Sequence, residues 1–124
     1  MKKRILVVDD EPGLTRMVKL NLERAGDYEV RTENQGAAAL AAAREFQPHL
    51  IFLDVMMPDM GGDAVSQELR DDPVLAGIPV VFMTAIVTKS ETGEMGSNIG
   101  GNEFLAKPVK TEELVATIER ILGR

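Results

Sequence analysis

Short runs of consecutive apolar residues alternate along this chain with longer segments whose apolar positions recur at helical spacing. The short runs are Ile5–Val8, Leu50–Leu53, Val80–Met83 and Phe104–Ala106. A short apolar run bounded by turn-forming residues is typical of a buried strand. Strands and helices alternate from end to end, which predicts βα repeats around a parallel sheet.

Helical spacing or composition predicts four helices, at 14–22, 35–46, 62–70 and 114–122. Pro12 suits the first turn of the first of these helices, and Thr111 is the expected N-cap of the last. The segment 35–46 is dominated by alanine, a strong helix former. Pro73 discourages continuation of the helix that precedes it.

Length, charge and composition narrow the class of protein. The 124 residues contain no internal repeat, so we expect one domain, 1–124, that buries roughly two-thirds of its unfolded surface. A net charge of -6 with scattered basic residues argues against direct DNA binding. The absence of cysteine excludes disulfides and zinc-thiolate sites. No apolar run suits a secretory signal or a membrane span, so a cytoplasmic location fits.

Polar residues with chemical potential stand where the predicted strands end. Asp9 and Asp10 follow the first strand, Asp54 the second and Thr84 the third, while Lys107 follows the last. Each has an ordinary explanation alone, since acids routinely cap helices. Neighbouring parallel strands would bring all five to one edge of the sheet, where ligands bind in open α/β folds. The combination therefore predicts a functional site.

This set of residues resembles the receiver domain of two-component response regulators, and the resemblance covers essentially the whole chain. It implies a flavodoxin-like, doubly wound α/β fold of three layers. The sheet would have five parallel strands in the order 2-1-3-4-5, with five helices. By resemblance, Asp54 is the phosphoacceptor, Thr84 the hydroxyl that meets the phosphoryl group and Lys107 its cationic partner. Phe104 stands at the position of the switching aromatic residue.

The same resemblance implies a divalent metal, Mg²⁺ or Mn²⁺, beside the phosphoacceptor. Its expected ligands are carboxylate oxygens of Asp10 and Asp54, the backbone carbonyl of Met56 and waters, with Asp9 acting mainly through water. The backbone N–H of Ala85 would help to bind the phosphoryl oxygens. The product is an aspartyl phosphate, so the chain is expected to be a phosphoacceptor switch and not an enzyme.

The implied phosphoryl donor is a phosphohistidine on a sensor histidine kinase or a histidine phosphotransfer protein, and small acyl phosphates can substitute. Specificity for the donor is expected partly on the helix from Leu14 to Ala25. A downstream protein target would contact the face formed by a helix within 88–102, the strand at 104–106 and the last helix. No nucleic acid or membrane partner is expected, and the chain would be a monomer or a phosphorylation-dependent dimer.

The segment 88–102 departs from the pattern. It contains Gly93, Gly96, Gly100 and Gly101 inside the expected fourth helix, and each interior glycine costs about 1 kcal/mol relative to alanine. We favour a short helix flanked by loops. The alternative is a loosely held segment that orders on phosphorylation or partner binding.

The sequence also bears on several alternative functions. The chain is expected to be a single-domain regulator or phosphorelay intermediate, or a receiver excised from a larger regulator or hybrid kinase. The sequence weighs against a Mg²⁺-dependent phosphohydrolase with Asp54 as nucleophile. Such enzymes of the haloacid dehalogenase type generally carry a second aspartate two residues after the nucleophile as general acid and base, and Met56 stands there. A scaffold that has lost phosphorylation would not need the whole acid, hydroxyl and lysine set. His49, the one histidine, is assigned no chemistry, and Asp59 is interpreted as a solvated loop acid.

Overall fold

The computed structural model describes residues 2–85, 97–99 and 102–123. The strands are β1 (Lys3–Val8), β2 (Tyr28–Glu33), β3 (Leu50–Asp54), β4 (Val80–Thr84), β5 (Ser97–Ile99) and β6 (Asn102–Ala106). The helices are α1 (Pro12–Ala25), the short 3₁₀ helix η1 (Gly36–Ala38), α2 (Ala39–Phe46), α3 (Gly62–Asp71) and α4 (Thr111–Leu122).

Five parallel strands form the body of one sheet in the order β2-β1-β3-β4-β6, which confirms the predicted flavodoxin-like topology. Two details of the described structure differ from the prediction. The sheet has a sixth strand, because β5 pairs antiparallel with β6 and occupies its outer edge. The described residues contain four α-helices instead of five.

Both corrections concern the segment predicted to contain the fourth helix. Residues 97–99 are strand β5, and residue 102 begins β6, so this end of the segment is extended. Pairing with β5 satisfies backbone groups that β6 would otherwise expose as the edge of the sheet. Most of the expected helix falls on 86–96 and 100–101, which lie outside the described residues.

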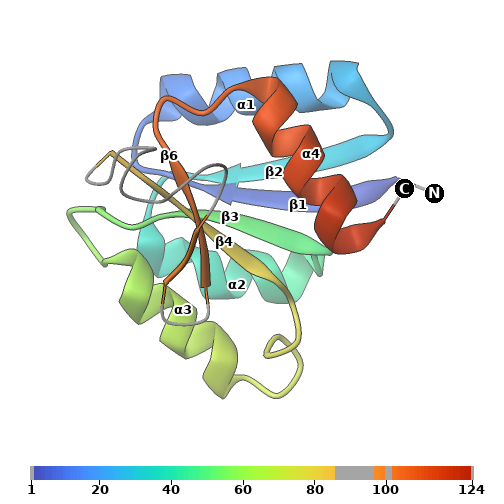
Figure 1. Ribbon diagram of the computed structural model, residues 1–124. Coiled ribbons are helices and arrows are strands. Elements are labelled where there is room, and N and C mark those ends of the chain that lie inside the picture. The colour runs from blue at the N-terminus through green and yellow to red at the C-terminus, as the bar shows by residue number, and fades with distance from the viewer. Residues whose placement is uncertain (1, 86–96, 100–101, 124) are drawn as a thin grey trace.

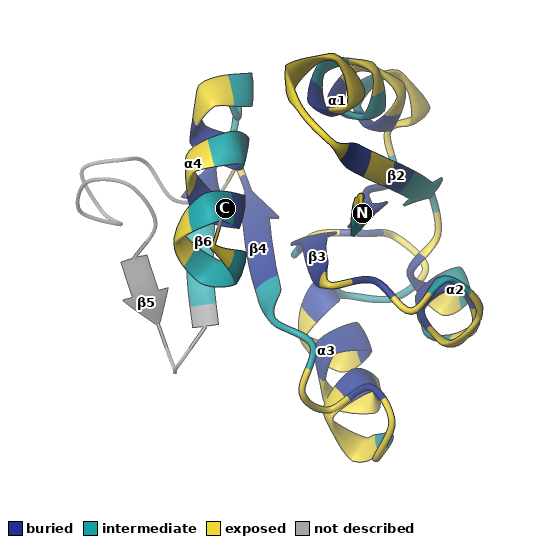
Figure 2. Cartoon of the chain, turned by 90° about the vertical axis from the view of Figure 1, so that its right-hand side faces the viewer, coloured by how far each residue is buried: buried dark blue, intermediate teal, exposed yellow. Residues whose placement is uncertain are grey.

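Helices cover both faces of the sheet, with α1 and α4 on one face and α2 and α3 on the other (Figure 1). Successive residues of β1 and β3 point to opposite faces, as strand geometry requires. Ile5, Val7 and Phe52 enter the core beneath α1 and α4, whereas Leu6 and Leu53 enter the core beneath α2 and α3. Buried residues follow both faces of β3 and β4, while the outer surfaces of the helices are exposed (Figure 2).

The strand β2 is the element that the apolar pattern did not locate. Only Tyr28 and Val30 are buried in it, and its other four residues are partly or fully exposed. It pairs on one side with β1, from Lys3 opposite Tyr28 to Val8 opposite Glu33. An edge strand of this kind needs no continuous apolar run, so its sequence gives a weak signal.

The helix starts lie close to their predicted positions. α1 begins at Pro12, with Glu11 as N-cap. α4 begins at Thr111, so the N-cap is Lys110 and not the threonine. The side chain of Glu113 accepts a hydrogen bond from the backbone N–H of Lys110 at 3.1 Å, which satisfies one of the free donors at this helix start.

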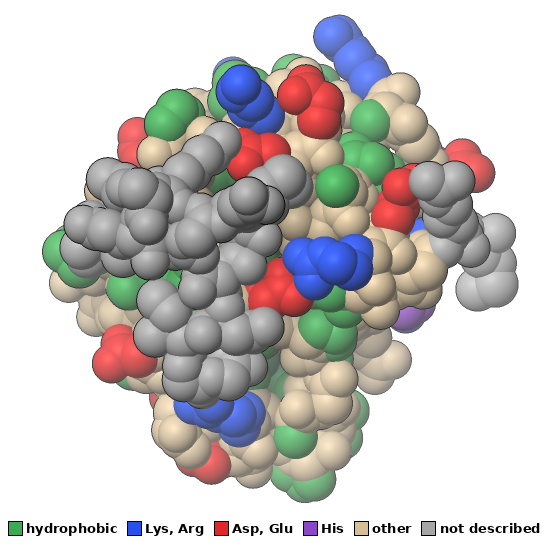
Figure 3. All heavy atoms as spheres, in the orientation of Figure 1, with side chains coloured by type: hydrophobic (Ala, Val, Ile, Leu, Met, Phe, Trp, Pro, Cys, Tyr) green, Lys and Arg blue, Asp and Glu red, His purple; other side chains and the backbone are tan. Residues whose placement is uncertain are grey.

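Charged side chains of both signs are interspersed among the described atoms on the face shown in Figure 3, and they form no extended basic patch there. Among the described residues, no helix has the length and apolar content that a membrane span requires.

Candidate functional site

The carboxyl ends of four parallel strands place the predicted site residues at one edge of the sheet. β1 leads into Asp9, β3 ends at Asp54 and β4 ends at Thr84. Thr84 pairs in register with Ala106 of β6, and the backbone N–H of Lys107 donates to the carbonyl of Thr84 at 2.9 Å. The strand register therefore carries Lys107 to the acidic group.

Three carboxylates meet at this edge. Oxygens of Asp9, Asp10 and Asp54 lie within 4.8 Å of one another. Asp9 is fully buried and Asp54 is 3% exposed, so water screens the repulsion between them poorly. Oδ2 of Asp9 is buried, and the ammonium group of Lys107 lies 2.6 Å from it. Such an oxygen-rich set fits a divalent cation.

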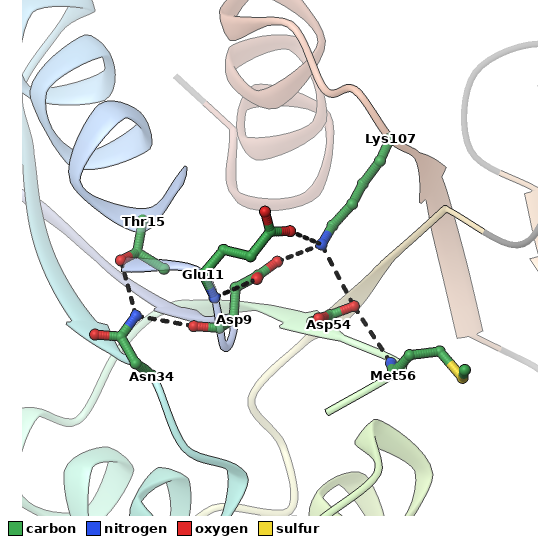
Figure 4. Close-up of polar contacts among 7 residues, drawn as sticks. All are labelled: Asp9, Glu11, Thr15, Asn34, Asp54, Met56 and Lys107. Atoms are coloured by element: carbon green, nitrogen blue, oxygen red, sulfur yellow. Dashed lines mark hydrogen bonds and ion pairs between the residues drawn. The ribbon is translucent and has the colours of Figure 1, made fainter. Parts of the chain in front are cut away.

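Lys107 lies between the two buried acids (Figure 4). Its Nζ is 2.6 Å from Oδ2 of Asp9 and 3.5 Å from Oδ1 of Asp54, and it also lies 3.7 Å from Oε1 of Glu11. The peptide bond between Lys107 and Pro108 is cis. One buried cation thus offsets part of the charge of the acidic cluster.

The pKa values follow from this arrangement. Burial and then the negative charge of Asp9 raise the pKa of Asp54 from 3.8 to about 6, although Lys107 and the N–H of Met56 act in the opposite direction. Burial alone would lower the pKa of Lys107, but contacts with Asp9, Asp54 and Glu11 outweigh it and raise that pKa. At neutral pH Asp54 is therefore mostly ionised and Lys107 is charged.

The remaining predicted site residues surround this group. Thr84 is buried, with 2% of its surface exposed. Ala85 directly follows it as an exposed bend. Met56 donates its backbone N–H to Oδ1 of Asp54 at 3.3 Å, while its side chain is 63% exposed.

Phe104 packs against the core on the side of the sheet that α2 and α3 cover. Its ring stacks on Phe82, with centroids 5.1 Å apart and the ring planes at 29°. It lines a small hollow with Val55 and residues of α3. Phe104 therefore packs between the body of the sheet and α3.

Sequence reasoning missed the support around Asp9. The side-chain amide of Asn34 donates to the backbone carbonyl of Asp9 at 2.9 Å and to the hydroxyl of Thr15 at 3.0 Å. The backbone N–H of Glu11 donates to Oδ1 of Asp9 at 3.0 Å. The polar Asn34 after β2 was the one available signal, and only the spatial pairing of β1 with β2 gives it meaning.

Two other assignments were tested by the structure. Nδ1 of His49 accepts a hydrogen bond from the backbone N–H of Arg4 at 2.9 Å, at the opposite end of β3 from Asp54. Asp59 is exposed, but it is not simply solvated. Its two carboxylate oxygens accept hydrogen bonds from the backbone N–H groups of Gly36 and Ala37 at 3.1 and 3.0 Å.

The chain belongs to the response regulator receiver domain family, whose model matches residues 5–119. The site described above occupies the carboxyl edge of that fold. The matched stretch includes every residue that we assign to the site.

Curated relatives extend the comparison to longer proteins. The chain is 39% identical over 121 residues to the "DNA-binding dual master transcriptional regulator RpaA" of Synechocystis, covering 98% of this chain and 49% of that protein. It is 39% identical over 126 residues to the "DNA-binding response regulator MtrA" of Mycolicibacterium smegmatis, covering 100% of this chain and 52% of that protein. The chain thus spans about half the length of these relatives.

Solved structures agree with the fold. A putative response regulator from Chloroflexus aurantiacus superposes with a TM-score of 0.83 at 31% identity, with full coverage of both chains. The chemotaxis protein CheY4 of Vibrio cholerae gives a TM-score of 0.82 at 30% identity, covering 98% of this chain and 99% of that one.

Proposed function

We propose that the chain is a phosphoacceptor switch that receives a phosphoryl group on Asp54. The observation that carries this proposal is the Asp54 carboxylate, buried among acids yet 3.5 Å from the ammonium group of Lys107. A pKa of about 6 leaves it mostly ionised at neutral pH. An ionised carboxylate has the electron pair that attack on phosphorus requires.

The donor in this proposal is a phosphohistidine of a sensor histidine kinase or a histidine phosphotransfer protein. An oxygen of Asp54 forms a bond to phosphorus, the phosphorus–nitrogen bond breaks, and the imidazole leaves with the electron pair and takes up a proton. Lys107 stabilises negative charge on the transferring oxygens, and the hydroxyl of Thr84 and the N–H of Ala85 donate hydrogen bonds to them. The chain is therefore an acceptor and not a kinase.

The acidic cluster is proposed to hold Mg²⁺ or Mn²⁺. The ligands would be Asp10, Asp54, the backbone carbonyl of Met56 and waters, with Asp9 acting mainly through water. When bound, the cation supplies the positive charge that lets a carboxylate approach an anionic phosphoryl group. The oxygens of Asp9, Asp10 and Asp54, which lie within 4.8 Å of one another, support this assignment.

Phosphorylation is proposed to change the surface through Thr84 and Phe104. A phosphoryl group adds about -1.5 to -2 charge and strong acceptor oxygens, which would draw the Thr84 hydroxyl inward. Phe104 would then turn toward the space that the hydroxyl leaves. The stacked pair of Phe104 and Phe82 is the contact that this movement would break.

Downstream, a protein target is proposed to contact the face that includes β6 and α4. Most of the expected helix of that face falls outside the described residues. RpaA and MtrA are named as DNA-binding regulators, so in a longer protein the receiver would control such an output. The receiver itself is proposed to bind no nucleic acid, to act in the cytoplasm as one domain, 1–124, and to be monomeric or to dimerise on phosphorylation.

Intact-mass spectrometry after incubation with acetyl phosphate and Mg²⁺ tests the proposal. We expect one added phosphoryl group on the wild-type protein. Asp54→Ala and a metal-free sample should both lack it. An adduct that persists in Asp54→Ala would overturn the assignment of the acceptor, and one that persists without metal would overturn the role of Mg²⁺.

A further inference from the structure

The loop between β3 and α3, residues 55–61, connects Asp54 to α3 and carries Met56. Two backbone hydrogen bonds fix its ends, from Val55 N–H to the carbonyl of Met83 at 3.1 Å and from Gly62 N–H to the carbonyl of Val55 at 2.9 Å. Between these ends, Met57 is buried in the core beneath α2 and α3. The outer side of the loop borders an open hollow of about 570 Å³.

Asp59 fastens the middle of this loop to a distant part of the chain. Its Oδ1 accepts from the N–H of Gly36 at 3.1 Å and its Oδ2 accepts from the N–H of Ala37 at 3.0 Å. These are the first two residues of η1, and Gln35, the N-cap of that helix, makes no side-chain capping hydrogen bond. Asp59 thus satisfies, from 22 residues away, donors that a helix start leaves free.

The backbone of the loop lies directly against Gly36. A Cβ atom at that position would come within 2.7 Å of the carbonyl oxygen of Met60 and 3.2 Å of Cε of Met57. The approach to the Met60 oxygen is shorter than Cβ atoms show in proteins, so only glycine fits without movement of the loop. Packing at Gly36 and two charge-assisted hydrogen bonds therefore act on the same four-residue stretch, 57–60.

The stretch that is held in this way directly follows Met56. The N–H of Met56 donates to Oδ1 of Asp54 at 3.3 Å, and its carbonyl is the proposed metal ligand. A metal ligand supplied by the backbone is only as well placed as the loop that carries it.

We infer that Asp59 is a positioning residue for the metal site, because it holds the loop that presents the Met56 carbonyl beside Asp54. The hydrogen bonds of Asp59 reach Gly36 and Ala37, and Asp59 is not one of the residues of the polar network drawn in Figure 4. Its effect is transmitted by the backbone from residue 59 to residue 56. This inference rests on the proposed function, since it assumes that the acidic cluster binds a divalent cation.

The test is isothermal titration of Mg²⁺ and Mn²⁺ into the wild-type protein, Asp59→Ala and Gly36→Ala. We expect both variants to bind each metal about three- to tenfold more weakly. Asp72→Ala is the matched control, because Asp72 also accepts a backbone N–H, from Val74 at 2.9 Å, but on a loop remote from the acids. It should keep the wild-type affinity. Asp59→Asn retains one acceptor oxygen and should recover part of the loss.

Amide hydrogen exchange in the metal-free proteins supplies a second measurement. The amides of Gly36, Ala37 and Met56 should exchange severalfold faster in Asp59→Ala than in the wild type. A general loss of stability would instead accelerate amides throughout the core, and Asp72→Ala shows the size of that effect.

The outcomes separate this inference from the proposed function. If the wild-type protein binds neither metal, the proposed metal site is wrong. If the wild type binds metal, and Asp59→Ala and Gly36→Ala bind it equally well, the acidic cluster stands and the positioning role of Asp59 is refuted. An equal loss in Asp72→Ala would also refute it.

Discussion

Replacement of Asp54 by asparagine should stabilise the metal-free protein more at pH 8 than at pH 5. The side chain is 3% exposed, and burial followed by the charge of Asp9 raises its pKa from 3.8 to about 6. A raised pKa in the folded state means that the stabilising contribution is complete below the unfolded pKa, near 4. It is lost as the pH rises through 6, because the ionised form is then buried among other acids. Asparagine has no such titration.

The magnitude follows from the two pKa values of Asp54. With 3.8 unfolded and about 6 folded, the linkage relation gives a loss of about 1.4 kcal/mol between pH 5 and pH 8. The wild-type protein should lose this amount relative to Asp54→Asn over that range. Any effect of the asparagine side chain on packing adds the same amount to the difference in unfolding free energy at every pH. Only the change of this difference with pH therefore reports the titration of Asp54.

Urea unfolding followed by circular dichroism, in buffer containing EDTA, measures the difference at each pH. Asp72→Asn is a useful control, because the hydrogen bond from Arg44 and then the N–H of Val74 lower the pKa of Asp72. The stability that Asp72 contributes is present above its unfolded pKa and is lost only as the pH falls below that value. The difference in unfolding free energy between Asp72→Asn and the wild type should therefore be constant from pH 5 to pH 8. If the difference in unfolding free energy between Asp54→Asn and the wild type were equally independent of pH, the raised pKa of Asp54 would be refuted.

Three further changes probe the surroundings of the site. Gly62→Ala should destabilise the protein by about 1–3 kcal/mol in urea unfolding, because a Cβ there would lie 2.5 Å from the backbone oxygen of Asp54; an unchanged midpoint would contradict this. Asn34→Ala removes two hydrogen bonds and should cost about 1–2 kcal/mol in the same assay, with a smaller effect counting against its supporting role. Glu11→Gln should raise the rate of phosphorylation by acetyl phosphate about twofold at low salt and less at high salt, since Glu11 is an exposed acid 3.7 Å from Lys107; time-resolved mass spectra would show the reverse if the lysine needs this contact.

The carboxyl ends of the buried strands could be predicted from the sequence because two independent signals coincide there. A parallel strand covered on both faces gives a continuous apolar run, and its end is marked by the first polar residue. Asp54 after Leu50–Leu53 and Thr84 after Val80–Met83 show both signals. Register between neighbours then brings these residues together, so local patterns sufficed to find the acidic cluster and its lysine.

Edge elements could not be found in this way. β2 buries only Tyr28 and Val30, so nothing in its composition distinguishes it from an exposed loop. β5 exists as an antiparallel partner of β6, and pairing of that kind depends on the backbone of another strand more than on its own residues. We expected a helix within 88–102 because strands and helices alternate along the rest of the chain. Residues 97–99 form a strand instead.

Contacts between loops could not be predicted from the sequence either. Asp59 lies in a sequence, Pro58-Asp59-Met60-Gly61, that favours a turn on its own, and so the carboxylate seemed to need no partner. Its partners are backbone N–H groups at Gly36 and Ala37, and a backbone donor has no sequence signature. Glycine at 36 was visible, but the close approach of the loop that requires it was not.

In the proposed function Lys107 has two roles, and only one of them concerns the transition state. The Asp54 carboxylate is buried beside Asp9, and both burial and that charge favour its protonated, unreactive form. Lys107 Nζ, 2.6 Å from Asp9 and 3.5 Å from Asp54, lowers the pKa of Asp54 toward a value at which the nucleophile is ionised at neutral pH. The lysine therefore favours the ionised form of the proposed acceptor before any phosphoryl group would arrive. Since a strand end fixes each acid and the N–H of Lys107 is bonded to the carbonyl of Thr84, the sheet itself sets the balance of charge on which the proposed chemistry depends.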